Sequence, residues 1–211
     1  MNFVAVAALL SGLIAAGWQS SLLQPDQNAN TERLNTEQIE RGEIQVPGAP
    51  AGEVVRYRIR LLPVASFPGL PAAVGGQLRS RQCMIPQSFE AQAPENVIHG
   101  AFRAPGSDDW AALCSVGGST TLYVFLSGQF DAPIALRSQP DTAWLGAEPG
   151  ASIFGSGWGI AVRSASTLRA TRQMHGTAVF DHDGIEDARL ERSATVRYWQ
   201  DGKWLDLGGL N

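Results

Sequence analysis

Apolar and polar residues alternate strictly over one segment of the chain. From Val55 to Leu61 every second residue is apolar, and the positions between them are Arg56, Arg58 and Arg60. This period of two predicts a half-buried β-strand. The three arginines would share one face of that strand. They form either a candidate anion-binding stripe or an ordinary solvated face with acidic partners.

Two further β-motifs are visible downstream. Residues 97–126 contain three apolar segments separated by turn residues, which predicts an antiparallel three-strand meander. Near the C-terminus, Asp201–Gly202 is a dipeptide preferred in type I′ turns, which predicts a β-hairpin. This hairpin would place Trp199 opposite Trp204. The tryptophan pair either covers the core or forms an exposed ligand platform, as in carbohydrate-binding proteins.

Two segments carry helical signals. Leu70, Val74 and Leu78 recur at four-residue spacing, which predicts a short helix. Asp183 is a candidate N-cap, and Glu186 follows three residues later as in a capping box, which predicts a second helix. The sequence therefore predicts an α+β fold that is mostly antiparallel β-sheet, with the meander, the C-terminal hairpin and two short helices.

The N-terminal region is typical of an exported protein. Residues 3–18 carry no charge and are fewer than the roughly 20 residues that a membrane-spanning helix needs. Small residues close this segment, so residues 1–18 are predicted to be a signal peptide, with an uncleaved anchor as the alternative. Residues 19–52 are predicted to be a flexible polar tail or linker. Residues 53–211 are predicted to be a single globular domain.

The two cysteines agree with export. In an oxidising compartment Cys83 and Cys114 are expected to form a disulfide, because the chain has no CxxC spacing that favours a metal or redox pair. The predicted location is periplasmic or secreted, with no stable membrane span after signal cleavage. A formal charge of −4 gives no electrostatic reason to expect nucleic acid as a partner.

Short motifs with a defined chemistry are absent from the sequence. It has no P-loop, no HExxH and no GxSxG, so nucleotide, zinc-peptidase and α/β-hydrolase chemistry lack support. Ser88, Ser115 and Ser119 coexist with three histidines, so a triad assembled in space remains open.

The acidic stretch around residue 183 is the densest candidate site. Asp181, Asp183 and Asp187 follow the spacing Asp-x-Asp-Gly-x-x-Asp. This spacing resembles the later half of the calcium loops of thrombospondin type-3 and dockerin-like repeats, which implies calcium bound by these three acids. Val179 occupies the position of the first ligand. The alternative interpretation is the capped start of a helix.

One local resemblance concerns the meander. The matching residues are Ile98, Gly100, Phe102, Gly106, Asp109, Ala111 and Leu113. They resemble one blade unit of the FG-GAP type, which implies an apolar strand, a turn rich in Gly and Asp, and a second apolar strand. A propeller requires several repeats, and the chain has one copy, so the resemblance implies strand order alone.

A broader resemblance covers most of the chain after residue 70. It rests on five segments: Cys83–Gln87, Asn96–Gly100, Trp110–Ser115, His182–Asp187 and Tyr198–Trp204. Together they resemble a group of secreted bacterial proteins with no established activity. This resemblance implies an exported protein and carries no chemistry.

The leading functional prediction is an exported, non-catalytic binding or envelope-associated domain with an unknown ligand or envelope component as partner. The alternative is a cell-envelope hydrolase, or a calcium-dependent protein, that uses the acidic cluster of residues 181–187. A hydrolase predicts that these acids converge with His99 or His175 in a polar cleft. A binding domain predicts an exposed aromatic or arginine face instead.

Overall fold

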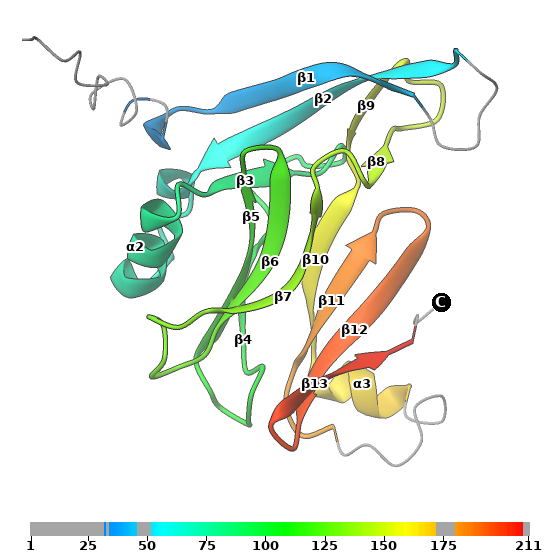
Figure 1. Ribbon diagram of the computed structural model, residues 1–211. Coiled ribbons are helices and arrows are strands. Elements are labelled where there is room, and N and C mark those ends of the chain that lie inside the picture. The colour runs from blue at the N-terminus through cyan, green and yellow to red at the C-terminus, as the bar shows by residue number, and fades with distance from the viewer. Residues whose placement is uncertain (1–31, 33, 46–51, 172–179, 209–211) are drawn as a thin grey trace, which may run out of the picture.

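The computed structural model describes residues 32, 34–45, 52–171 and 180–208, which form two β-sheets and short helices (Figure 1). The predicted signal peptide, residues 1–18, lies outside the described residues. The fold is α+β and mostly antiparallel β-sheet with two α-helices, as the sequence predicts.

Nine strands form the larger sheet. They are β1 (Gln38–Gln45), β2 (Val54–Pro63), β3 (Met84–Gln87), β4 (Val97–Gly100), β5 (Asp109–Val116), β6 (Ser119–Phe125), β7 (Ile134–Pro140), β8 (Leu145–Gly146) and β9 (Ile153–Ser156). The main strand order is β7-β6-β5-β3-β2-β9-β8, with β1 paired to β2 and β4 paired to β5. Only the β2–β9 pair is parallel among the named strands.

Four strands form the smaller sheet, in the order β10-β11-β12-β13. They are β10 (Trp158–Arg163), β11 (Gly184–Arg189), β12 (Ser193–Gln200) and β13 (Lys203–Leu207). One buried cluster contains Leu113 and Leu122 from the larger sheet together with Trp158 and Ile185 from the smaller. The two sheets therefore share a hydrophobic core.

Two α-helices and one 3-10 turn pack against faces of the two sheets. The turn is η1 (Val64–Ser66), and the helices are α2 (Ala72–Ser80) and α3 (Ala165–Ala170). Val74 and Leu78 of α2 are fully buried, which confirms the predicted apolar face of this helix. The predicted disulfide is also present: Cys83 follows α2 and is bonded to Cys114 of β5, with the Cα atoms 4.9 Å apart.

The structure confirms the predicted β-motifs, each of which depends on a local sequence pattern. The alternating segment forms β2, and residues 97–126 form the β4–β5–β6 meander. In the β12–β13 hairpin, Trp199 lies opposite Trp204. Asp201 and Gly202 have φ angles of 52° and 79°. Positive φ at both central positions is what a type I′ turn requires.

The second predicted helix is wrong. Residues 184–189 form β11, which pairs with β10 on one side and β12 on the other. Gly184 lies so close to the neighbouring strand that an added Cβ would come within 2.7 Å of Val196 Cγ1. Backbone pairing on both sides outweighs the local capping signal. The second helix is instead α3, whose N-cap is Ser164; the Ser164 side chain accepts from the Thr167 N–H.

The predicted flexible tail also needs correction. Residues 38–45, within the predicted tail of 19–52, form β1 and pair along their whole length with β2. Inter-strand hydrogen bonds stabilise a segment whose polar composition gives little strand signal. In Figure 1 these two strands form a long ribbon that crosses one end of the larger sheet. This ribbon has one outward face and one face toward the sheet.

Candidate functional site

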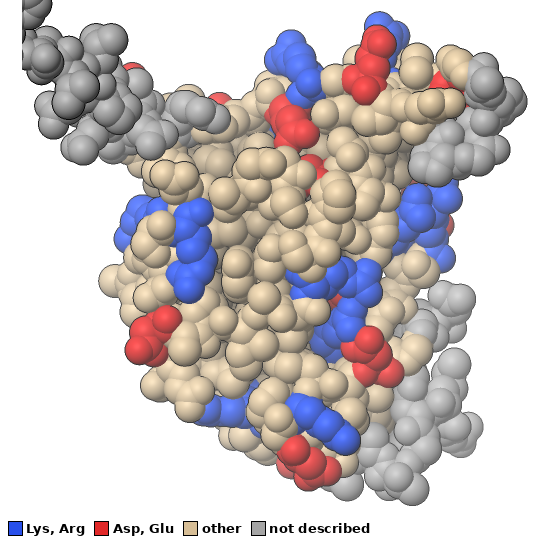
Figure 2. Space-filling view, viewed as in Figure 1, with Lys and Arg blue, Asp and Glu red and all other residues tan. Residues whose placement is uncertain are grey.

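The predicted arginine stripe lies on the outward face of the β1–β2 ribbon. Arg56, Arg58 and Arg60 are all exposed, and their even spacing puts them on one face of β2. The strand register places Arg41 of β1 directly opposite Arg58, so the sequence prediction missed a fourth arginine on this face. Figure 2 shows basic and acidic side chains together along the upper edge of the molecule, over the ribbon.

Acidic residues compensate only part of this charge. Arg60 forms an ion pair with Glu37, with Nε and Oε1 2.7 Å apart, and Glu43 lies opposite Arg56. Among the described residues, no acid forms an ion pair with Arg41 or Arg58. Two like charges directly opposite on one face repel each other, so this pair is unfavourable unless an anion binds between them.

Two apolar side chains adjoin the arginines. Val54 lies on the same face of β2, and Ile153 of β9 is aligned with Arg56 in the parallel pair. They remain 53% and 49% exposed, and they are two of four large apolar residues that the described chain leaves exposed. The outward face therefore combines positive charge with accessible apolar surface.

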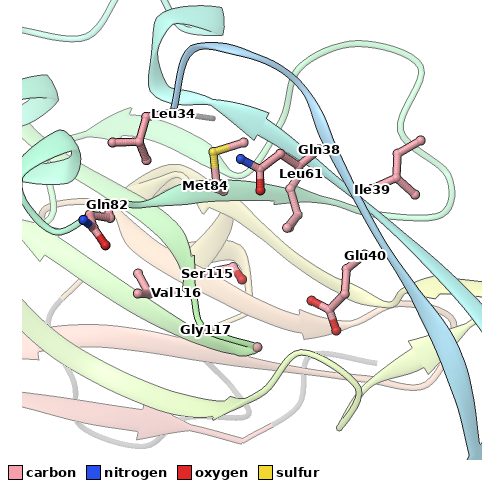
Figure 3. Close-up of a pocket in the computed structure, with 11 residues that line it drawn as sticks. Leu34, Gln38, Ile39, Glu40, Leu61, Gln82, Met84, Ser115, Val116 and Gly117 are labelled. Carbon is pink, nitrogen blue, oxygen red and sulfur yellow. The ribbon is translucent and has the colours of Figure 1, made fainter. Parts of the chain in front are cut away.

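The inward face of the ribbon covers a cavity of about 330 Å³. Gln38 and Glu40 of β1 lie over it, Leu61 and Met84 line its side, and Ser115 lies at its base (Figure 3). The described lining contains no lysine or arginine. The lining combines the Glu40 carboxyl, the Ser115 hydroxyl and the amides of Gln38 and Gln82 with a smaller apolar part, which suits a polar, uncharged organic ligand rather than an anion.

A pair of carboxyl groups lies at one side of this cavity. Asp141, which is only 7% exposed, accepts hydrogen bonds from Ser115 Oγ at 2.5 Å and from Thr120 Oγ1 at 2.6 Å. The Glu40 side chain lies near Asp141 and accepts a hydrogen bond from the Tyr57 hydroxyl at 3.2 Å. Burial, followed by contact with Asp141, raises the pKa of Glu40 above its ordinary value.

The raised pKa keeps a proton on the Glu40 carboxyl to a higher pH in the folded protein than in the unfolded chain. A carboxyl whose pKa is raised by folding contributes stability below its unfolded pKa, about 4.3, and loses that contribution as the pH rises through the folded pKa. The contribution of Glu40 to the packing of β1 against the sheet therefore decreases as Glu40 ionises. Asp141 of the loop after β7 and Tyr57 of β2 are the titratable groups that contact Glu40.

Glu40→Gln tests this pH dependence. The glutamine amide can donate to Asp141 as the protonated acid does, but it carries no titrating proton. We expect the free energy of unfolding of Glu40→Gln, relative to the unsubstituted protein, to rise as the pH rises above the unfolded pKa of about 4.3, and to level off once Glu40 is ionised in the folded protein. Urea unfolding of both proteins over a series of pH values measures the difference. A difference independent of pH would contradict the raised pKa of Glu40.

These cavity residues were missed by the sequence prediction. Glu40 lies in the segment interpreted as a tail, and Asp141 has no neighbouring acid or motif in the sequence. Ser115 was named only as one of three serines. The one available signal was the pair of acids flanking Arg41 and Gly42, which gives no information about depth or partners.

The predicted calcium site is not assembled. Asp183 accepts hydrogen bonds from the Ala101 and Ala165 N–H groups, and Asp187 binds Trp158 and Arg197. In the described parts of the chain no group of three His, Cys, Asp or Glu residues is positioned to hold a metal ion. Asp181, Asp183 and Asp187 each bind a separate protein partner, so the described structure does not bring the three acids together as the calcium-loop interpretation requires.

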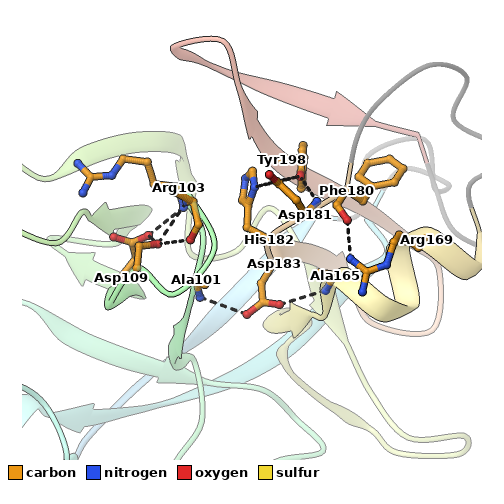
Figure 4. A network of polar contacts seen from close by, with 12 residues as sticks. Ala101, Arg103, Asp109, Ala165, Arg169, Phe180, Asp181, His182, Asp183 and Tyr198 are labelled. Carbon is orange, nitrogen blue, oxygen red and sulfur yellow. Dashed lines mark hydrogen bonds and ion pairs between the residues drawn. The ribbon is translucent and has the colours of Figure 1, made fainter.

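Asp181 belongs to a separate contact with His182 and Tyr198 (Figure 4). His182 Nδ1 lies 2.6 Å from Asp181 Oδ1 and 3.0 Å from the Tyr198 hydroxyl. The hydrogen bond from His182 lowers the pKa of Asp181, whereas burial raises the pKa of Tyr198. The His182 ring stacks on Tyr198 with centroids 4.3 Å apart. This geometry fixes the loop before β11 against β12.

The other histidines do not complete a catalytic cluster. His99 Nε2 pairs with exposed Asp108 at 2.5 Å and its ring lies 4.6 Å from that of Trp110. His175 lies outside the described residues. His99 therefore does not form the predicted cluster with the acids of residues 181–187.

The tryptophan pair covers the core more than it exposes a platform. Trp199 and Trp204 are half-buried, with ring centroids 5.4 Å apart in an edge-on arrangement. Trp204 packs against the cluster shared by the two sheets. Only the Trp199 side of the pair is available to a ligand.

No family model, no curated protein and no solved structure matches this chain. Within the described residues, no helix has the length and apolar character needed to cross a membrane. The functional interpretation therefore depends on the charge of the outward face and on the geometry of the cavity.

Proposed function

We propose that this protein is an exported, envelope-associated binding domain that docks on an anionic membrane surface through the outward face of its β1–β2 ribbon. The observation that carries this proposal is the cross-strand pair of Arg41 and Arg58, exposed and without an acidic partner among the described residues. Arg56 and Arg60 extend the same row. A lipid phosphate between Arg41 and Arg58 would remove their repulsion.

The apolar neighbours favour a membrane over a soluble polyanion. Val54 and Ile153 are about half exposed beside the arginines. Apolar side chains gain free energy at the boundary between headgroups and acyl chains, whereas they gain little on a solvated polymer. Each arginine near an anionic surface contributes about 1 kcal/mol, so four arginines opposed by Glu37 and Glu43 give weak, reversible docking.

Vesicle partitioning tests the proposal with the expected mature chain, residues 19–211. We expect binding to vesicles that contain anionic phospholipid, no binding to purely zwitterionic vesicles, and weaker binding at higher salt. Arg41→Ala combined with Arg58→Ala should lower partitioning roughly 10- to 30-fold, because it removes about 2 kcal/mol. Cosedimentation measures this change.

The matched control removes the same charge elsewhere. Arg79→Ala combined with Arg192→Ala changes two exposed arginines on α2 and on the β11–β12 turn. We expect this control to bind as the unsubstituted chain does. Equal losses in the two double variants, or binding to a soluble polyanion without binding to vesicles, would refute membrane docking.

A further inference from the structure

We infer that Ser115 is a nucleophile that cleaves an ester or amide bond of a substrate in the cavity beneath β1, with Asp141 as its base. This inference is independent of membrane docking, because the arginines lie on the outward face of the ribbon and the cavity lies under the inward face. It assigns an activity to residues that belong to three separate segments: β1, β5 and the loop after β7.

The serine and its base are already in contact. Ser115 Oγ donates to Asp141 Oδ2 at 2.5 Å, and Ser115 lines the cavity while Asp141 lies behind it. Thr120 Oγ1 donates to the other carboxylate oxygen at 2.6 Å and fixes its orientation. A nucleophile hydrogen-bonded to a base that is oriented by a third group is the arrangement that activates a hydroxyl.

The second carboxyl is difficult to explain by stability alone. The two hydroxyls suffice to satisfy a buried Asp141, yet Glu40 is also placed against it. No ion pair joins either carboxyl to a cation in the parts of the chain that are described. Carboxyls in contact without a cation disfavour ionisation of one of them, and such pairs concentrate at functional sites.

Backbone donors lie beside the nucleophile. Gly117 and Gly118 form the β5–β6 turn, with φ angles of 59° and 81°, and both line the cavity. The hairpin pairs Val116 with Ser119, and within the described chain neither glycine N–H donates a hydrogen bond. Two free N–H groups within three residues of the serine are suited to an oxyanion.

The proposed reaction needs only these residues, the substrate and one water molecule. The Ser115 hydroxyl proton passes to Asp141, Oγ bonds to the carbonyl carbon, and the carbonyl oxygen becomes an oxyanion near the Gly117–Gly118 turn. The proton on Asp141 then passes to the leaving oxygen or nitrogen as its bond to carbon breaks. Water repeats the sequence on the acyl-serine, giving a carboxylic acid and the original enzyme. Glu40 is a positioning residue that holds Asp141.

The cavity walls indicate the substrate class. Leu34, Leu61, Met84 and Val116 supply an apolar wall, and the described lining has no cationic side chain. The glutamines Gln38 and Gln82 add amide donors and acceptors to this lining, so the cavity favours an uncharged acyl group that carries polar substituents over one with an anionic acyl part. The volume of about 330 Å³ is at the lower end of the range for small-molecule pockets.

A fluorophosphonate with a short alkyl chain tests the nucleophile, again on residues 19–211. The serine oxygen would bond to phosphorus as fluoride leaves, and we expect the mass increase on the peptide that contains Ser115. Ser115→Ala should lose this label and Ser119→Ala should keep it, because Ser119 bonds Gln139 instead. Labelling of heat-unfolded protein should be absent.

Two carboxyl variants make the result decisive. Asp141→Asn should slow labelling roughly 100-fold or more, as loss of a general base does. Glu40→Gln should keep the label but change its pH profile, because the substitution removes the titrating carboxyl that lies beside Asp141. Absence of a Ser115 label in folded protein, or equal rates with Asp141→Asn, would overturn the inference whether or not the vesicle experiment succeeds.

Discussion

Asp187→Ala is expected to destabilise the protein by about 3–5 kcal/mol, because it removes one partner of a buried ion pair. The Asp187 side chain is fully buried and lies 3.0 Å from Arg197 Nη2 and 3.2 Å from Arg137 Nε. It also accepts from Trp158 Nε1 at 2.8 Å. Alanine would leave the Trp158 indole N–H without an acceptor and would remove the buried carboxylate that compensates the Arg197 guanidinium, so that Arg197 would keep only the contact with exposed Asp206. Urea unfolding monitored by tryptophan fluorescence measures the change.

Asp206→Ala is the matched control for this prediction. Asp206 binds the same Arg197, but its side chain is 61% exposed, so its loss should cost about 1 kcal/mol or less. Adding Arg197→Met to Asp187→Ala should recover part of the lost stability, because the uncompensated charge is removed. Equal effects of Asp187→Ala and Asp206→Ala would contradict a buried-charge origin.

Asn96→Ala is expected to cost about 3–4 kcal/mol, since it leaves buried backbone groups without partners. The Asn96 amide donates to Pro86 O at 2.8 Å and to Trp158 O at 3.2 Å, and its oxygen accepts from the Ile160 N–H at 3.0 Å. One buried side chain therefore joins β3 of the larger sheet to β10 of the smaller. The urea midpoint and slope give the change in free energy.

Asn96→Gly separates the hydrogen bonds from the backbone conformation. Asn96 has a φ of 68°, a region that glycine enters without strain and alanine does not. If the hydrogen bonds dominate, glycine should destabilise nearly as much as alanine, with a difference of about 1 kcal/mol. A glycine variant close to the unsubstituted protein in stability would assign the effect to φ instead.

Local patterns predicted the elements that depend on neighbouring residues. β2 and the β12–β13 hairpin were predictable because alternation and the Asp201–Gly202 turn act within a few positions. β1 and β11 were not, since each is stabilised by strands from elsewhere in the chain. Asp183 accepts hydrogen bonds from backbone N–H groups, as a capping residue does. These groups belong to Ala101 and Ala165, however, and not to the segment that follows Asp183.

Some residues of the candidate sites were likewise predictable from local pattern, and others depend on strand pairing. The arginine stripe was predictable, because strand periodicity alone places Arg56, Arg58 and Arg60 on one face. The fourth member, Arg41, required the β1–β2 register. The pairing of Glu40 with Asp141 depends on how a terminal strand crosses the sheet, which residue type and spacing do not encode.

The two-sided ribbon has a mechanical consequence. β1 pairs only with β2 among the described strands, so it can detach without breaking any other strand pair. Peeling would part Arg41 from Arg58 on one side and Glu40 from Asp141 on the other. Detachment of this single eight-residue strand would therefore separate Arg41 from the arginines of β2 and open the cavity at the same time.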